Sequence, residues 1–289
     1  MKKVKIIIIF LFVFLLIFSM ICLAQTEIST NLSNEVSMND NPCLVGSNFS
    51  GLKESDTFKN YQIVQLEKLH HPGKYRFTEG LEYHDGYLYE GTGKIYSSFI
   101  KKIDITKSYI VMEKKTSTVL HRSFGEGITI HNDKLIQLTY KNGQAYVYNL
   151  NNFKKIKTFS YKGEGWGLTH NENCFIMSNG TSNINFRNFD NFSIEYTLKV
   201  TQDGKAVAGM NELEYVNGVI FANIFPLDYI IMIDATNGKV IGKINGKELG
   251  CTTGKDNVLN GIAYDEIEDV FYLTGKNCKY IYKVRFYPQ

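Results

Sequence analysis

The stretch Phe124-Gly125-Glu126-Gly127-Ile128 decides the fold, because variants of it recur along the chain. Each variant places small, acidic, amide or aromatic residues directly before the apolar start of an expected strand. The related stretches are Phe77-Thr78-Glu79-Gly80-Leu81, Glu164-Gly165-Trp166-Gly167-Leu168, Met210-Asn211-Glu212-Leu213 and Leu259-Asn260-Gly261-Ile262. They follow one another at intervals of about 40 to 50 residues, which is the repeat length of propeller blades.

The segments between these stretches alternate short apolar runs with turn signals. After Gly127 we expect strands over residues 128–130, 134–138, 145–149 and 154–159. After Glu212 we expect strands over residues 213–216, 219–223, 229–234 and 239–244. The dipeptides Asn217-Gly218 and Asn237-Gly238 are strong hairpin signals within this second series. Each repeat therefore carries about four strands.

The last repeat is one strand short. It offers strands over 262–264, 270–274 and 280–286, and the sequence then ends at Gln289. An alternating run at 61–66 precedes the first repeat and can pair with the C-terminal strand, which would close the ring and protect its sheet edges. The sequence therefore predicts an all-β fold, a five-bladed β-propeller over residues 58–289, closed by pairing of an N-terminal strand with the C-terminal blade.

The first 24 residues predict a targeting segment. A basic start is followed by residues 6–24, which are apolar except for Ser19 and end at the small residue Ala24. Two interpretations stay open, a signal peptide that is cleaved and an uncleaved membrane anchor. Both place the rest of the chain outside the cytoplasm, as a secreted, periplasmic or anchored protein. Residues 25–57 are rich in Ser, Asn, Thr and acidic residues and predict a flexible polar leader.

The charge balance gives no support to nucleic-acid binding. The chain has 32 basic and 29 acidic residues, and loss of the three lysines in residues 1–24 leaves 29 of each. No basic stripe remains that would bind a phosphate backbone. We expect no nucleic-acid partner and a monomeric chain.

Four cysteines lie beyond the targeting segment. Outside the cytoplasm an even number of cysteines permits disulfides, and Cys251 with Cys278 is the first pair we expect. For Cys43 and Cys174 a disulfide and free thiols both stay open. No Cys or His spacing is typical of a metal site, and we expect no metal and no cofactor. The pair His70-His71 is expected in a solvated loop.

Eight side chains are expected to meet at one mouth of the central channel. The innermost strand of each blade lines this channel, so equivalent positions of the repeated stretches face one another. These positions hold Glu79, Glu126, Trp166, Asn211 and Asn260. The following strands end at the same mouth with Tyr140, Phe225 and Lys276. Carboxylates, amides, aromatic walls and one ammonium suit a small ligand with a primary amine and carbonyl oxygens.

At these positions the sequence resembles the glutaminyl-peptide cyclotransferases of the plant and bacterial type, a family of five-bladed propellers. The matching stretches keep the family's order along the propeller. They are residues 77–81, 124–129, 137–139, 163–168, 211–215, 222–224, 260–264 and 274–276. The resemblance implies an acyltransferase that converts N-terminal glutaminyl residues of peptides and proteins to pyroglutamyl with release of ammonia, without a metal.

The resemblance also implies roles for individual residues. Glu126 matches the family's essential carboxylate, which can carry a proton from the attacking to the leaving nitrogen. Asn211 and Lys276 match residues of the active centre, and we assign them substrate positioning and oxyanion stabilisation. Trp166 matches an aromatic wall. We expect Glu79, Tyr140, Phe225 and Asn260 to bind substrate.

Three positions depart from the family pattern. The family often has Gln at the position of Glu79, and commonly Trp at the positions of Tyr140 and Phe225. Because aromatic character survives at the last two, we expect an altered substrate preference rather than a lost activity. Glu79 adds a second acid beside Glu126, which can raise the pKa of one of them or strengthen binding of the substrate amine.

Two other functions stay open at this point. Glu and Asn side chains that converge in a propeller channel can coordinate Ca²⁺, as in lactonase-like hydrolases. Trp166 and Lys276 at the same mouth speak against a cation there. The other alternative is a non-catalytic propeller that binds partner proteins on its faces, for which Glu126 would be dispensable.

Overall fold

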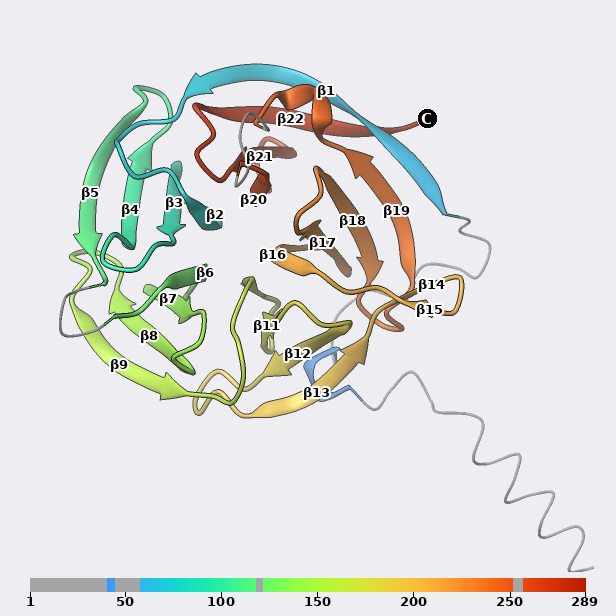
Figure 1. The fold of residues 1–289 in the computed structure, drawn as a ribbon, viewed down its shortest axis with the longest axis horizontal. Coiled ribbons are helices and arrows are strands. Elements are labelled where there is room, and N and C mark those ends of the chain that lie inside the picture. Colours follow the sequence, from blue (N-terminus) through green and yellow to red (C-terminus); the bar gives the residue numbers. More distant parts are fainter. Residues whose placement is uncertain (1–40, 45–57, 118–121, 252–256) are drawn as a thin grey trace, which may run out of the picture. The chain divides into compact units, whose positions relative to one another are not determined.

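The computed structural model describes residues 41–44, 58–117, 122–251 and 257–289. Their strands form five four-stranded antiparallel blades that follow one another around a central axis (Figure 1). The prediction of a five-bladed all-β propeller is confirmed. A short extra hairpin of β14 (Thr201–Gln202) and β15 (Lys205–Ala206) follows the third blade and was not expected from the sequence.

The first four blades are continuous in sequence, and each begins at the axis and ends at the rim. Blade 1 consists of β2 (Thr78–His84), β3 (Tyr87–Thr92), β4 (Phe99–Asp104) and β5 (Tyr109–Lys115). Blade 2 consists of β6 (Gly125–His131), β7 (Lys134–Thr139), β8 (Gln144–Asn149) and β9 (Lys155–Ser160). Blade 3 consists of β10 (Leu168–His170), β11 (Phe175–Met177), β12 (Asn183–Arg187) and β13 (Ile194–Lys199). Blade 4 consists of β16 (Met210–Val216), β17 (Val219–Ile224), β18 (Tyr229–Asp234) and β19 (Val240–Asn245).

Blade 5 joins the two ends of the propeller. Its inner strands are β20 (Leu259–Asp265), β21 (Val270–Gly275) and β22 (Tyr280–Pro288). The outer strand is β1 (Lys59–His70), which runs antiparallel to β22 from Tyr61↔Pro288 to His70↔Tyr280. The start of β1 also pairs in parallel with β19, so blades 4 and 5 share one eight-stranded sheet. The predicted closure by an N-terminal strand is therefore confirmed.

The blades are held together by apolar side chains that face the neighbouring blade. The described residues contain five clusters of such buried side chains, one for each pair of adjacent blades. Between blades 1 and 2, for example, Tyr89 and Ile100 pack against Ile128 and Leu135. The alternating pattern of each strand supplies one apolar face to each side, and burial of these faces is the main favourable contribution to the fold.

Small residues near the axis allow the innermost strands to approach closely. A Cβ on Gly80 would lie 2.4 Å from the backbone nitrogen of Ile128, and one on Gly167 would lie 2.0 Å from the backbone oxygen of Asn211. At the equivalent position of blade 4 the carboxylate of Glu212 accepts hydrogen bonds from the backbone of Leu81 and Ile262 (3.2 and 2.7 Å). Glu212 thus links blade 4 to blades 1 and 5 across the channel.

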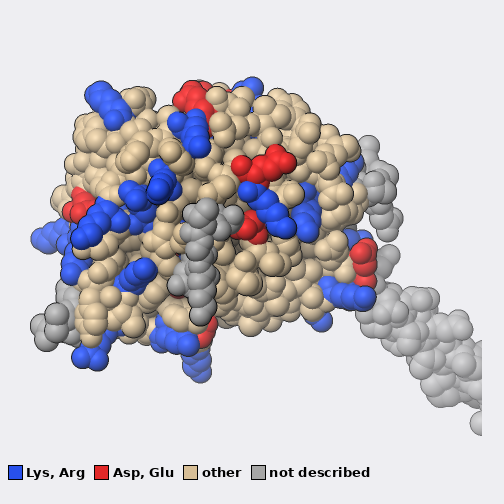
Figure 2. Space-filling model, turned by 45° about the horizontal axis from the view of Figure 1, so that its top comes forward, with Lys and Arg blue, Asp and Glu red and all other residues tan. Residues whose placement is uncertain are grey.

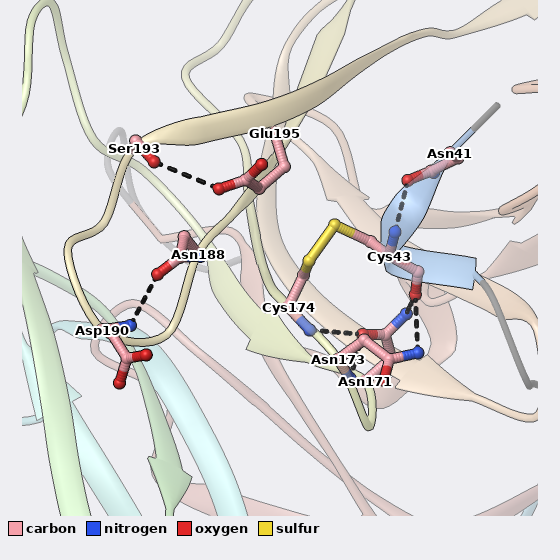
Figure 3. Close-up of a disulfide and its surroundings, with 9 residues drawn as sticks. All are labelled: Asn41, Cys43, Asn171, Asn173, Cys174, Asn188, Asp190, Ser193 and Glu195. Carbon is pink, nitrogen blue, oxygen red and sulfur yellow. Dashed lines mark hydrogen bonds between the residues drawn. A yellow bond between two sulfur atoms is a disulfide. The ribbon is translucent and has the colours of Figure 1, made fainter.

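The part of the chain that the structure describes contains two disulfides. The expected pair Cys251–Cys278 is confirmed, and it connects the segment before β20 to the β21–β22 turn. Cys43 and Cys174, left open by the sequence, form the second disulfide. Figure 3 shows how the side-chain amides of Asn171 and Asn173 point at the carbonyl oxygen of Cys43, at 2.8 and 3.2 Å. The 3-10 turn η1 (Pro42–Leu44) is thereby fixed to blade 3.

His71 corrects one expectation. It was expected in a solvated loop, but it is fully buried, and its Nε2 lies 3.1 Å from Oε1 of Glu90. The ammonium of Lys101 lies 2.7 Å from the other oxygen of Glu90, and the hydroxyl of Thr78 donates to the first. Burial would raise the pKa of Glu90, but Lys101 and His71 together lower it to about 2.

The targeting segment lies outside the described residues, as does the leader except for residues 41–44, so both stay predictions. Among the residues that the structure describes, no helix is long and apolar enough to cross a membrane. On the face shown in Figure 2, Lys and Arg side chains are interspersed with acidic ones and separated by uncharged surface.

Candidate active site

A pocket of about 180 Å³ opens at one mouth of the central channel. Seven of the eight residues that were predicted to meet at this mouth line the pocket. Two further aromatic residues complete the lining. The lining residues are Phe77, Glu79, Phe124, Glu126, Tyr140, Trp166, Asn211, Phe225 and Lys276. They come from all five blades, so the complete ring is needed to form the pocket.

Bulges turn the polar side chains into this mouth. In four of the five innermost strands the pairing register shifts at the repeated stretch, between Thr78 and Gly80, Gly125 and Ile128, Met210 and Leu213, and Leu259 and Ile262. A bulge inserts an unpaired residue and redirects its side chain. Glu79, Glu126 and Asn211 occupy these positions and line the pocket.

Asn260 occupies the bulge of blade 5 but does not line the pocket. Its Nδ2 donates to Oε2 of Glu79 at 3.2 Å and to the backbone oxygen of Thr78 at 3.0 Å. We predicted Asn260 to bind substrate, but the structure places it behind Glu79. Asn260 orients Glu79, which faces the cavity.

Two carboxyl groups and one ammonium form the polar centre of the pocket. Nζ of Lys276 lies 2.7 Å from Oε2 of Glu79, and both side chains are buried. Glu79 and Glu126 are hydrogen-bonded to each other. Because this bond joins two acids, one of them must carry a proton.

Burial and neighbouring charge determine which acid holds that proton. Burial raises the pKa of Glu79 to about 6, although Lys276 and the hydrogen bond from Glu126 act in the opposite direction. Burial, together with the charge of Glu79, raises the pKa of Glu126 well above its usual value. Near neutral pH Glu126 is therefore protonated and donates to an ionised Glu79.

Asn211 presents a hydrogen-bonding group that the described residues leave unused. Its carboxamide oxygen is buried and has no hydrogen-bond partner among them. Its backbone oxygen accepts a hydrogen bond from the hydroxyl of Ser178 at 2.7 Å, which fixes the main chain at this point. A buried polar atom without a partner is costly, so a bound ligand that donates to Asn211 would gain from this contact.

The aromatic residues form a collar around these polar groups. Successive rings lie 6.0 to 6.3 Å apart in the order Phe77, Phe124, Tyr140, Trp166, Phe225. The ammonium of Lys276 completes the circle, 5.0 Å from the ring centroid of Phe225 and 5.2 Å from that of Phe77. Such a collar buries an aliphatic side chain while the polar centre binds its end.

The position of Trp166 depends on residues that the sequence did not single out. Its indole Nε1 donates to Oε2 of Glu164 at 3.0 Å, and Glu164 in turn pairs with Lys141 at 3.4 Å. The indole also lies against Gly180, where a Cβ would come within 2.6 Å of the ring. Glu164 and the pocket residue Phe124 were not predicted as site residues. Both belong to the repeated stretches, so their place in the repeat could have identified them.

Comparisons with known proteins agree with this geometry. The family model described as glutamine cyclotransferase matches residues 42–286. The chain is 30% identical over 247 residues to a glutaminyl-peptide cyclotransferase of Arabidopsis thaliana, covering 83% of this chain and 75% of the relative. The crystal structure of Myxococcus xanthus glutaminyl cyclase superposes with a TM-score of 0.74 at 28% identity, covering 80% of this chain and 99% of the other. The chain therefore belongs to the glutamine cyclotransferase family.

Proposed function

We propose that this protein is a glutaminyl-peptide cyclotransferase. In this reaction the free α-amine of an N-terminal glutamine attacks the side-chain amide carbon of the same residue. A new C–N bond closes the five-membered ring, the old C–N bond breaks, and ammonia leaves. The membership of the family and the chemistry of the pocket both support this proposal.

The pocket suits one glutamine residue. A volume of about 180 Å³ is small, and the collar of five aromatic rings fits the methylene groups of a glutamine side chain. The carboxylate of Glu79 is an acceptor for the α-amine. The unpaired amide oxygen of Asn211 is a second acceptor, which suits a substrate that donates N–H groups.

Glu126 is the residue to which we assign the proton transfer. The attacking nitrogen must lose a proton and the leaving nitrogen must gain one. A protonated Glu126 gives its proton to the leaving nitrogen and recovers one from the attacking nitrogen, so the enzyme is unchanged at the end. The ionised Glu79 beside it stabilises the protonated form of Glu126 before the transfer.

Lys276 and Asn211 are assigned to the developing oxyanion and to substrate position. The carbonyl oxygen gains negative charge when the amine adds to the amide carbon. The ammonium of Lys276 and the side-chain amide of Asn211 both belong to residues that line the cavity, so they can stabilise this charge with little reorganisation. Because Lys276 is also paired with Glu79, its ammonium is held in a fixed place.

The observation that carries the proposal is the buried carboxyl of Glu126, which lines the pocket together with Glu79 and Lys276 in a chain of this family. The test is ammonia release from a short peptide with N-terminal Gln. We expect Glu126→Gln to lower kcat by about 100-fold or more, the usual scale for loss of a general acid and base. The exposed Glu172→Gln is the matched control and should keep wild-type activity. Wild-type turnover in Glu126→Gln would remove the assigned role.

The same assay separates the two other functions. A Ca²⁺-dependent hydrolase is not favoured, because the ammonium of Lys276 lies 2.7 Å from Glu79, where a metal would need oxygen ligands. Within the described residues no group of three or more His, Cys, Asp or Glu side chains is arranged to hold a metal ion. Loss of turnover with EDTA would support the metal enzyme, and absence of turnover under all conditions would support a binding protein.

We also propose that the protein works outside the cytoplasm as a monomer. Two disulfides are typical of an oxidising compartment. Secretion after cleavage near Ala24, or anchoring by residues 6–24, follows from the N-terminal sequence. N-terminal sequencing of the protein purified from its host distinguishes the two.

A further inference from the structure

A short loop beside the pocket has an unusual backbone. The loop connects β3 to β4, and two of its non-glycine residues have positive φ, Lys94 (145°) and Tyr96 (68°). Such conformations are unfavourable for residues that carry a side chain, and they persist where the surroundings enforce them. Ser98 provides part of this support, since its hydroxyl donates to the backbone oxygen of Lys94 and accepts from the amide of Gly125, both at 2.9 Å.

The strained loop presents a cation and two apolar side chains at the edge of the pocket. Nζ of Lys94 lies 4.7 Å from the ring centroid of Phe77, a pocket residue. Ile95 and Tyr96 are 54% and 38% exposed, and Arg122 lies 5.7 Å from the ring of Tyr96. Lys94 and Arg122 form no ion pair with any described residue.

The other edges of the pocket have a different character. Beside Tyr140 and Trp166, the charge of Lys141 is offset by Glu164 at 3.4 Å. Two residues after Phe225, the apolar side chain of Leu227 is 45% exposed. On the side of Lys94, two cations, Lys94 and Arg122, therefore lack an acidic partner among the described residues.

The distance between Lys94 and the polar centre of the pocket can be bounded. Lys94 and Lys276 both lie near the ring of Phe77, at 4.7 and 5.2 Å from its centroid. Their ammonium groups are therefore at most about 10 Å apart, which two or three extended residues span. When the N-terminal glutamine fills the pocket, the residues that follow it, up to the third, are therefore within reach of Lys94.

We propose that Lys94, Tyr96 and Arg122 form a subsite that binds a carboxylate of the peptide two or three residues beyond the N-terminal glutamine. The proposal rests on the proposed function, because it needs a glutaminyl peptide in the pocket. The carboxylate is an Asp or Glu side chain or the C-terminus of a short peptide, and Ile95 and Tyr96 contact the apolar part of the same residues. The enzyme thus prefers acidic sequences after the glutamine.

The test compares ammonia release by the full chain from matched amidated peptides. Gln-Ala-Glu-Ala-NH₂ is compared with its Gln and Lys counterparts at the third position, and free tripeptide acid with tripeptide amide. We expect kcat/KM to be roughly two- to fivefold higher for the Glu than for the Gln peptide, mainly through KM, as for one exposed ion pair. The Lys peptide should be poorer than both, and added salt should reduce the differences.

Variants assign the preference to the loop. In Lys94→Gln the kcat/KM values for the Glu and Gln peptides should become equal. In Lys94→Arg the higher kcat/KM for the Glu peptide should remain. The matched control is Lys155→Gln, because Lys155 also lies 4.7 Å from an aromatic ring, that of Tyr146, but on an outer strand. If the free tripeptide acid is preferred over its amide but the Glu and Gln peptides are equal, the bound carboxylate is the C-terminus of the peptide.

The negative outcomes are distinct. Equal kcat/KM for acidic and neutral peptides, or a preference that survives in Lys94→Gln, would overturn the subsite while leaving the cyclotransferase intact. No ammonia from any peptide with the wild-type chain would overturn the proposed function, and the peptide subsite with it.

Discussion

Two acids and one ammonium share a space from which most water is excluded. Lys276 offsets the charge of one carboxylate, Glu79, at 2.7 Å. A second buried carboxylate would have no counterion, so Glu126 keeps its proton instead. A relative with Gln at the position of Glu79 would have no such pair. The additional acid therefore changes the protonation of the site.

This pair predicts a particular pH dependence. In the proposed mechanism the active form has Glu79 ionised and Glu126 protonated, so kcat should rise as pH increases through about 6, where Glu79 ionises. It should fall at higher pH as Glu126 loses its proton. In Glu79→Gln the limb near pH 6 should vanish, and the alkaline limb should move to lower pH because the charge that raised the pKa of Glu126 is gone.

The measurement is kcat against pH for both proteins with one saturating Gln peptide. Saturation matters because the substrate amine itself titrates at about pH 8. An acid limb that is identical in Glu79→Gln and wild type would mean that Glu79 does not control it.

Residue-level prediction from the sequence succeeded where the repeat itself carried the information. Equivalent positions of the five stretches placed Glu79, Glu126, Trp166 and Asn211 at one mouth. It did not show that Asn260 lies outside the pocket lining and donates to Glu79, because this contact depends on the three-dimensional arrangement. The burial of His71 was also missed, since its partner Glu90 lies on another strand.

Among the secondary-structure elements, the connection between β1 and β2 has the greatest influence on the site. It carries Phe77 and leads into Glu79, and it is held from the side by buried charge. Lys101 on β4 is paired with Glu90 on β3 at 2.7 Å and also donates to the backbone oxygen of Tyr75. The ion pair therefore positions a segment that contains the pocket residue Phe77 and leads into Glu79.

Glu90→Gln should destabilise the protein strongly. It leaves the buried ammonium of Lys101 without a counterion, and breaking such a pair costs about 3–5 kcal/mol. Because the pKa of Glu90 is lowered to about 2 from a usual 4.5, its contribution is complete above about pH 4.5 and is lost as pH falls through about 2. The free energy of unfolding in urea, measured at pH 7 and at pH 3, checks both statements.

The exposed Glu113→Gln on β5 is the control for this substitution and should unfold at the wild-type urea concentration. If Glu90→Gln did the same, the buried pair would contribute nothing net to stability.

Most of the strands could be predicted from the sequence. Asn-Gly turns fixed the hairpins of blade 4, and the observed β17 and β18 match the expected strands within one residue. Blade 3 is less regular, with only three residues each in β10 and β11. The hairpin of β14 and β15 escaped prediction because its strands have two residues each, too few for a periodic pattern.

For the whole molecule, closure depends on one strand. β1 pairs with β22 along most of its length and with β19 at its start. Without it the outer edges of blades 4 and 5 would expose unpaired backbone groups. The disulfide between Cys43 and Cys174 attaches η1 to blade 3 only, so it does not replace this closure.

Removal of residues 1–70 should therefore abolish cooperative unfolding and cause aggregation, whereas removal of residues 1–40 should not. Thermal unfolding and size-exclusion chromatography measure both. The larger truncation also removes Cys43, so the double variant Cys43→Ser, Cys174→Ser in the longer chain is needed as a control. A monomeric, cooperatively melting chain without β1 would contradict the role of this strand.

The closing strand also constrains the order in which the protein can mature during synthesis. β1 leaves the ribosome before every other strand of the propeller, yet its partners lie at residues 242–244 and 280–288. The backbone groups of β1 therefore cannot form their strand pairing until nearly the whole chain has been synthesised. Lys276 belongs to the same late segment, so a nascent or prematurely terminated chain cannot hold a finished pocket. Translation products that end before Lys276 therefore lack part of the pocket, whichever blades they contain.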